Sequence, residues 1–410
     1  MSREARGRRR RGGLYRNGAA FTTQIRGETL GKLQAETIVV GGGVIGCAIA
    51  YELASRGKEV ILIERARIAG ETSSAAAGML AADNEMFHTA LISKLAYESR
   101  KRLHQQKEQL QRLSGIEIGL QQNGFITPFR NEDEMKKYCD TRRSTDLLTE
   151  QMWWDHSNLQ REAPWISKET FGALYRASES ELLPVNLAHA YAGAAQTMGA
   201  KVIEGVQNVS LSADSSGIQA VETSIGRLTC KQVVVAAGLQ GGEILKQVGL
   251  HLPTLPVKGE IAAIQYAQHD TDYRPDKTVY ADNVYIVPKA NGEVWIGATS
   301  LPGHSDRDVT VEGIQKLLAS AANWVPGIQQ AQFIRAWAGV RPSTPDGLPY
   351  LGACKSIPGL YTAFGHYRNG ILLSAITGSL MADLMDGHSS EELGIDELSP
   401  ERLSRKEIMQ

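Results

Sequence analysis

Three glycines early in the chain have the spacing of a phosphate-binding turn. Gly41, Gly43 and Gly46 stand as G-x-G-x-x-G, and Glu64 follows the turn within about 20 residues. In such a turn the first glycine makes the sharp bend, the second lets the backbone approach a pyrophosphate, and the third allows close helix–strand packing. The carboxylate of Glu64 would accept hydrogen bonds from ribose hydroxyls. The spacing predicts a dinucleotide site, and an ordinary glycine-rich turn is the alternative.

A strand, a helix and a second strand must hold these residues in place. The apolar run 36–40 predicts a buried strand, and residues 44–56 predict a helix with small and apolar side chains on one face. A second strand at 58–63 ends beside Glu64. A helix that begins at the glycine turn presents free N–H groups and a partial positive charge to phosphates.

Three further segments bear on whether the dinucleotide is NAD or FAD. Residues 72–79, TSSAAAGM, are small where a third alternating strand–helix unit would otherwise continue, as if the backbone lay along an extended ligand. A flexible Ser/Ala loop is the alternative. Residues 233–238, VVVAAG, and 365–371, GHYRNGI, have a similar character. The last would aim a helix N-terminus at a flavin ring, which gains negative charge on reduction, so the pattern favours FAD.

The rest of the chain alternates between helix-rich and strand-rich segments. Further helices are expected at 90–113, 187–199 and 371–385, and further strands at 201–206, 232–237 and 359–364. Residues 115–180 are mixed, and 253–338 are rich in alternating β-type runs. We therefore expect interleaved domains: a discontinuous nucleotide-binding domain at 35–112, 181–250 and 340–390, a substrate-binding domain at 113–180 and 251–339, and a C-terminal tail at 391–410.

Composition limits the classes of partner. The chain has 410 residues, 42% of them hydrophobic, and its 44 basic and 45 acidic residues leave a net charge of -1. We therefore expect a small-molecule ligand and neither nucleic acid nor a membrane. The four scattered cysteines indicate a cytoplasmic setting and no metal site. Residues 1–34, with RGRRRR, predict a disordered basic leader, and a nucleic-acid arm or transit peptide is the alternative.

Motifs along most of the chain resemble those of one flavoprotein family. They are GGGVIG with Glu64, ETSSAAAGML, PVKGE, VYIVPK, WAGVRPSTPDGLPYLG and GHYRNGILLSAITG. Together they look like the glycine oxidase branch of the FAD-dependent amine oxidases, the D-amino acid oxidase (DAO) family, which also includes monomeric sarcosine oxidase. The resemblance runs from about residue 35 to the C-terminus. GxGxxG is common to many flavoproteins, whereas SAAAGML and GHYRNGILL are more specific.

This resemblance implies an α/β fold with two domains. One is a Rossmann-like FAD-binding domain of the glutathione-reductase type, and the other is a substrate domain with a mixed, largely antiparallel sheet flanked by helices. It also implies a homotetramer that oxidises glycine, sarcosine or small D-amino acids to the imine or α-keto acid, with O2 reduced to H2O2, and a bacterial role in making the thiazole of thiamin. The alternatives are a D-amino acid dehydrogenase that passes electrons to a quinone, a sarcosine oxidase, and a flavin-binding protein without turnover.

Two residues match positions where the family holds its substrate, and Arg368 is a further candidate. Arg341 matches the carboxylate-binding arginine, since a guanidinium offers two parallel charged hydrogen bonds, and a structural ion pair is its alternative role. Tyr285 would add a phenol hydroxyl. Tyr280 lies five positions earlier, so on one regular strand the two rings would face opposite sides and only one could line the pocket. Arg368 either lies beside the ligand or flavin or ties down the loop before the last helix.

Four other residues carry narrower expectations. Oxidation of a neutral amine by hydride transfer needs no strong base, so we expect no acid/base residue and a structural role for His366. Met79 should lie near the flavin or the active-site wall, and plain core filling is its alternative role. Ser300 follows GAT, where relatives often carry a bulkier apolar residue, and predicts a wider or more polar pocket. Cys354 is expected to be a small buried residue, so the FAD should be non-covalent.

The residues expected to contact FAD come from all these segments. They are Gly41, Gly43, Val44, Ile45, Gly46, Glu64, Arg65, Thr72, Ser73, Ala76, Ala77, Gly78, Met79, Val206, Ala237, Gly238, His366, Arg368, Asn369, Gly370 and Ile371.

Overall fold

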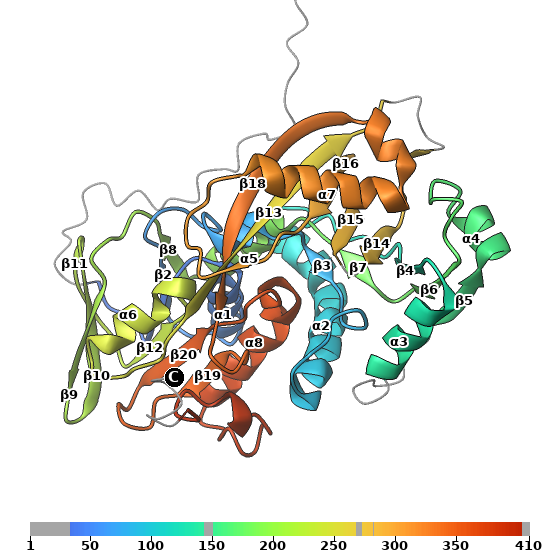
Figure 1. Cartoon of the computed structure of the whole chain (residues 1–410). Coiled ribbons are helices and arrows are strands. Elements are labelled where there is room, and N and C mark those ends of the chain that lie inside the picture. The colour runs from blue at the N-terminus through green and yellow to red at the C-terminus, as the bar shows by residue number, and fades with distance from the viewer. Residues whose placement is uncertain (1–32, 143–150, 268–272, 282, 404–410) are drawn as a thin grey trace, which may run out of the picture.

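Two large β-sheets, one mainly parallel and one mainly antiparallel, organise the chain (Figure 1). The computed structural model describes residues 33–142, 151–267, 273–281 and 283–403. Most of the leader predicted at residues 1–34, including RGRRRR, lies outside these ranges. None of the helices in the described ranges has the length and apolar character needed to cross a bilayer.

The first sheet has six strands in the order β19-β20-β12-β1-β2-β8. Their bounds are Thr37–Val40 (β1), Val60–Ile63 (β2), Lys201–Ile203 (β8), Gln232–Val235 (β12), Tyr350–Ala353 (β19) and Leu360–Phe364 (β20). All neighbours run parallel except β19, which pairs antiparallel with β20. The parallel strands therefore end at one edge, where open α/β sheets bind their ligands.

Four helices form the main core against this sheet. They are α1 (Val44–Ser55), α2 (Ala90–Ser114), α5 (Pro184–Thr197) and α8 (Gly370–Met385), and they pack on one another. Both α1 and α8 are apolar on nearly every side, as expected of fully buried helices. Small residues let them approach closely, since a side chain at Gly378 would come within 2.8 Å of the Ala48 carbonyl oxygen.

A small meander covers the other face of the first sheet. It consists of β9 (Ser210–Asp214), β10 (Gly217–Thr223) and β11 (Gly226–Thr229), with α6 (Gly241–Lys246) beside it. The apolar side chains of Ile218, Val221 and Leu228 pack there against those of the parallel sheet. This meander lies at one end of the molecule in Figure 1, opposite α3 (Glu132–Arg142) and α4 (His156–Glu162).

The second sheet has nine strands, and β4 with β14 is its one parallel pair within the described residues. Its strands are β4 (Phe125–Phe129), β5 (Met152–Asp155), β6 (Gly172–Arg176), β13 (Leu255–Gln265), β14 (Thr278–Ala281), β15 (Val284–Pro288), β16 (Glu293–Gly297), β17 (Leu301–Pro302) and β18 (Gln332–Ser343). Helix α7 (Val311–Trp324) packs across β13, β15 and β16, as Figure 1 shows at the top.

The expected α/β class, with a mainly parallel sheet and a mixed, largely antiparallel second sheet, is confirmed. Most expected elements shift by only one to three residues, because terminal turns and capping residues are weakly encoded. The helix expected at 187–199 begins at Pro184, which is well suited to a first helical turn, and the strand expected at 201–206 ends at Ile203. The predicted domain boundaries stay a prediction.

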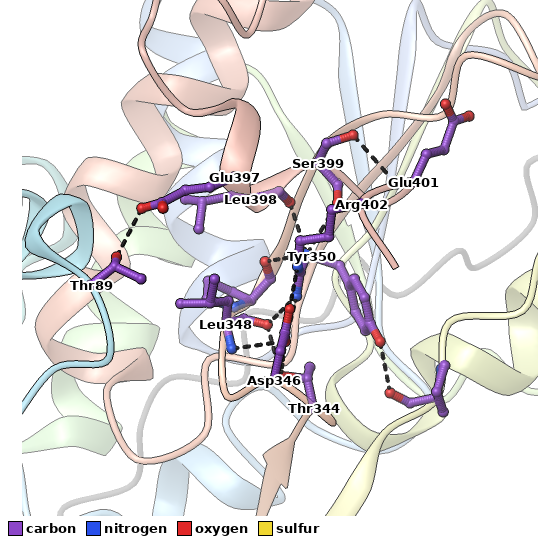
Figure 2. Close-up of polar contacts among 12 residues, drawn as sticks. Thr89, Thr344, Asp346, Leu348, Tyr350, Glu397, Leu398, Ser399, Glu401 and Arg402 are labelled. Carbon is purple, nitrogen blue, oxygen red and sulfur yellow. Dashed lines mark hydrogen bonds and ion pairs between the residues drawn. The ribbon is translucent and has the colours of Figure 1, made fainter. Parts of the chain in front are cut away.

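The C-terminal segment is fastened to the loop between β18 and β19 by one arginine, Arg402 (Figure 2). Its guanidinium donates to both carboxylate oxygens of Asp346, at 2.7 and 3.0 Å, and to the carbonyl of Leu348 at 2.6 Å. It also lies over the ring of Tyr350, 4.5 Å from the centroid. Because β18 leads directly into this loop, the contact holds the end of that strand.

We expect Arg402→Ala to lower the free energy of unfolding by about 2 kcal/mol or more, because it removes the guanidinium that pairs with a half-buried carboxylate and donates to four backbone carbonyls. Urea denaturation would measure the change. Arg161→Ala is the control, since Arg161 and Glu162 form an exposed pair and should contribute little. Equal effects of the two substitutions would contradict the role given to Arg402.

The loss of stability in Arg402→Ala should depend on pH. Burial would raise the pKa of Asp346, but hydrogen bonds from Arg402 outweigh it and hold the pKa below its usual value. A carboxyl with a lowered pKa stabilises the folded state above its unfolded-state pKa and loses that contribution as pH falls. The difference between wild type and Arg402→Ala should therefore be complete at pH 7 and shrink below about pH 4.

Candidate functional site

One cavity of about 410 Å³ runs from the edge of the first sheet to strands of the second. Its lining includes the residues after β1, β2 and β12, the small-residue run and the start of α8. Gly259 and Ile261 of β13, Tyr285 of β15 and Arg341 of β18 line it from the second sheet. The cavity therefore brings together segments from almost the whole length of the chain.

The glycine turn is shaped by close backbone contacts. Gly41 has φ +114°, and a side chain there would come within 2.6 Å of the Ala236 carbonyl oxygen. A side chain at Gly46 would overlap the carbonyl oxygen of Gly41. Gly41 and Gly43 line the cavity, whereas Gly46 does not. Gly46 thus has the packing position expected of the third glycine and makes no lining contact.

The Glu64 carboxylate is fixed by backbone donors at the edge of the cavity. One of its oxygens accepts from the N–H of Gly42 at 2.6 Å, and the other accepts from that of Ala66 at 2.8 Å. Each oxygen retains a further lone pair for a ligand hydroxyl. Arg65, which also lines the cavity, forms an ion pair with Glu71, a lining residue that sequence reasoning did not identify.

The small-residue run is ordered and joins the two sheets. It forms the short helix η2 (Thr72–Ala75) and then β3 (Met79–Leu80). The Ser73 hydroxyl accepts from the N–H of Val44 at 3.0 Å, and the Thr72 hydroxyl donates to the Val340 carbonyl at 2.7 Å. The alternative of a flexible loop is therefore wrong. Gly78 and Met79 at the end of the run line the cavity.

The segment before α8 closes another side of the cavity. Tyr367 has φ +50° and donates its N–H to the Pro342 carbonyl at 2.9 Å, which aims the start of α8 at the cavity. His366 is buried, with its Nε2 3.1 Å from the Thr377 hydroxyl. Burial lowers the pKa of His366 to about 4, so the ring is neutral at pH 7. A histidine with so low a pKa is a weak base.

Arg341 faces the cavity from β18 and makes no ion pair within the described part of the chain. Its guanidinium donates to the Thr299 carbonyl at 3.3 Å and lies against Gly259, where any side chain would overlap it. The alternative of a structural ion pair is therefore wrong for the described residues. The remaining guanidinium donors can serve a ligand carboxylate.

The two tyrosines correct one expectation. Tyr280 and Tyr285 lie on separate strands, β14 and β15, and are directly paired across the hairpin, so their side chains share a face. The expectation of one regular strand with opposed rings was wrong, because the chain turns between them. Tyr285 lines the cavity and Tyr280 does not. Burial raises the pKa of Tyr285 to about 12, so its hydroxyl remains a donor.

Arg368 also lines the cavity, but it has a carboxylate partner that sequence reasoning missed. Its Nη2 lies 3.2 Å from Glu85 Oε1 and 3.2 Å from the Tyr280 hydroxyl, which itself donates to Glu85 at 3.0 Å. Proximity to Glu85 raises the pKa of Arg368. Glu85 lines the cavity as well. It lies in an aperiodic stretch, so no spacing or motif pointed to it.

A buried ionic network holds the segment that carries Glu85. Glu179 accepts from the N–H groups of Asp83 and Asn84, at 2.6 and 2.9 Å. Arg100 donates to Glu179 at 2.9 Å and to Asp83 at 2.6 Å. Backbone donors fixed by a buried carboxylate leave this segment little freedom, so Glu85 is held in place on the cavity wall.

The remaining expectations separate into those near the cavity and those away from it. Ser300 is exposed and does not line the cavity, so the expectation of a pocket widened by this residue was wrong. Cys354 is buried, and burial raises its pKa to about 12. None of the described residues lining the cavity is a cysteine. All the residues expected to contact FAD, except Gly46, line the cavity; their roles remain predictions.

This cavity fits FAD by its shape and its donors. The glycine turn excludes side chains at the edge of a parallel sheet, an anchored carboxylate follows the second strand, and two helices, α1 and α8, begin at the wall. Helix N-termini favour phosphates and a reduced flavin. The fold and the site thus define the class: an FAD-dependent oxidoreductase in which a second sheet contributes to the wall of the cavity.

Comparison with known proteins identifies the family. The family model described as FAD dependent oxidoreductase (DAO) matches residues 36–384, and the chain belongs to this family. It is 38% identical over 373 residues to the glycine oxidase of Geobacillus kaustophilus, covering 90% of this chain and 97% of that protein. The crystal structure of glycine oxidase from G. kaustophilus superposes with a TM-score of 0.82 at 36% identity, covering 91% of this chain and 100% of that one.

A further relative is a longer protein. The bifunctional protein ThiO/ThiG of Nostoc sp. is 31% identical over 358 residues, which cover 87% of this chain and 54% of that protein.

We expect Gly46→Ala to release FAD, because the added methyl group would push α1 away from the Gly41 carbonyl and open the turn. The ratio of flavin to protein absorbance after gel filtration would measure retention. Ser55→Ala, an exposed change at the other end of α1, is the control and should keep the flavin. Full flavin content in Gly46→Ala would show that this close packing is not required.

Proposed function

We propose that the protein oxidises glycine and related small amines, such as sarcosine and small D-amino acids, with O2 as the electron acceptor. The observation that carries this proposal is Arg341, a partly buried guanidinium without an acidic partner among the described residues, facing the cavity. An unpaired charge of this kind is costly in a folded protein unless a ligand meets it. The carboxylate of an amino acid has the matching charge and shape.

The chain's own residues bind and orient the substrate. Arg341 holds the carboxylate through parallel charged hydrogen bonds, and the Tyr285 hydroxyl donates a further one. Both side chains lie against glycines, Gly259 and Gly297, whose missing side chains give them room. Orientation of this kind lowers the barrier without an acid or base. Bound FAD would supply the acceptor for the two electrons that leave the amine, and O2 would be the final oxidant.

No residue is needed as a strong base if the amine enters neutral. His366 is the histidine that lines the cavity, and its pKa of about 4 makes it a poor acceptor at pH 7. We propose that it supports α8 through Thr377. We further propose that FAD is held without a covalent link, since the described lining contains no cysteine.

The wider setting is also a proposal. The similar proteins named glycine oxidase and ThiO/ThiG support a role in supplying the imine of glycine for the thiazole of thiamin. We propose a cytoplasmic homotetramer, which the resemblance to the glycine oxidase branch implies.

The purified flavoprotein should consume O2 and release H2O2 when given glycine without any added acceptor. A panel of glycine, sarcosine and D-alanine, followed with an oxygen electrode and a peroxide assay, would rank the substrates. A D-amino acid dehydrogenase would instead need a quinone, and a protein without turnover would keep its flavin oxidised under anaerobic glycine. Either result would contradict the proposal.

We expect Arg341→Ala to raise KM for glycine by about 100-fold or more, because two charged hydrogen bonds contribute several kcal/mol. Tyr285→Phe should raise it less, by about tenfold, since it removes a single neutral donor. Steady-state oxygen consumption would give both values. Arg335→Ala is the matched control: this arginine lies on the same strand, pairs with Glu293 and does not line the cavity. A similar rise in KM in Arg335→Ala would contradict the proposal that Arg341 binds the substrate carboxylate.

A further inference from the structure

We propose that Glu85 limits the site to amines with one acid group, because its carboxylate pairs with the guanidinium of Arg368 and keeps it from binding a second acid group of the substrate. This inference rests on the proposed oxidation of small amines and adds a residue that sets the substrate class. In this proposal Glu85 determines substrate specificity, although it lies outside the motifs identified in the sequence.

Two arginines of the cavity, one from β18 and one from the segment before α8, differ in their partners. Arg341 and Arg368 both line the cavity. Within the described chain Arg341 donates to a carbonyl and pairs with no carboxylate, whereas Arg368 pairs with Glu85 at 3.2 Å. One cationic position is therefore open to a ligand carboxylate, and the other is neutralised by the protein.

Tyr285 lines the same cavity as Glu85, Arg341 and Arg368, and all three charges affect the pKa of its phenol. Burial raises its pKa, the two arginines oppose that change, and Glu85 reinforces it. Each of the three groups is thus near enough to the Tyr285 hydroxyl to influence its pKa. A second acid group bound beside Tyr285 would meet the Glu85 carboxylate as well as the Arg368 guanidinium.

The position of Glu85 favours a lasting ion pair with Arg368. Its side chain is only 9% exposed, against 41% for Arg368, and Tyr280 donates to the same carboxylate oxygen. Its own N–H donates to the Ala81 carbonyl at 3.0 Å, and the residues before it are held by Glu179. A dicarboxylate would have to displace a buried, positioned carboxylate or approach it as a like charge, and both are unfavourable.

Glu85→Gln tests this directly with two anions that are not amines, acetate and malonate. Glutamine keeps an oxygen that can accept from Tyr280 but removes the charge opposite Arg368. Titration calorimetry on the flavin-loaded protein gives the dissociation constants. We expect the affinity for malonate relative to acetate to rise by about tenfold or more in Glu85→Gln. The kcat/KM for iminodiacetate relative to glycine should rise in the same direction.

Two further variants decide whether Arg368 is responsible. Glu293→Gln removes a carboxylate from another Arg–Glu pair outside the cavity lining and should leave the malonate-to-acetate ratio unchanged. The double variant Glu85→Gln/Arg368→Gln should not show the rise in malonate-to-acetate affinity that is expected for Glu85→Gln alone. Arg368→Gln alone should lower the affinity for malonate relative to acetate, since it leaves the Glu85 charge without its arginine. This variant tests the inference on its own if Glu85→Gln fails to fold.

An unchanged ratio in a folded, flavin-loaded Glu85→Gln protein would overturn the inference, as would a gain that survives the loss of Arg368. Binding of acetate and malonate needs no turnover. A protein that fails to oxidise glycine but shows the expected ratios would therefore refute the proposed function and leave the role of Glu85 standing.

Discussion

A junction of small residues between the two sheets governs the whole site. The helix η2 contacts the glycine turn through Ser73 and the strand β18 through Thr72, while Gly339 of β18 has no side chain where Ala75 packs. These contacts set how far the parallel sheet lies from the strand that carries Arg341. A bulky residue in this junction would separate the glycine turn from Arg341, because main chain and methyl groups already touch.

The second governing feature is the distribution of charge on the cavity wall. Arg341 is left without an acidic partner in the described chain, while Arg368 is paired with Glu85 and braced by Tyr280. Behind Glu85, one buried guanidinium, Arg100, serves two carboxylates. Burying such groups stabilises little by itself. Their value lies in positioning, since a fixed charge next to a ligand discriminates better than a mobile one.

Several features followed from the sequence because they depend on neighbours along the chain. The glycine spacing, the acid after the second strand and the small-residue run all lie on the cavity, and the fold class was correct. Ser300 was misjudged, since a position next to a motif does not fix the direction in which a side chain points. The two tyrosines were misjudged for a related reason: residues five apart can lie on one strand or oppose each other across a hairpin.

The sequence by itself determined the parallel strand–turn–helix unit and the presence of an arginine in a family motif, because local backbone preferences and short spacings are encoded within a few residues. Only the tertiary structure decided that, among the described residues, Arg368 has an acidic partner and Arg341 has none. Glu85 and Arg368 are far apart in the chain, and their pairing arises where β14, the segment after β3 and the start of α8 converge. Charge pairing depends on distance in space, and no pattern along one sequence reports that distance.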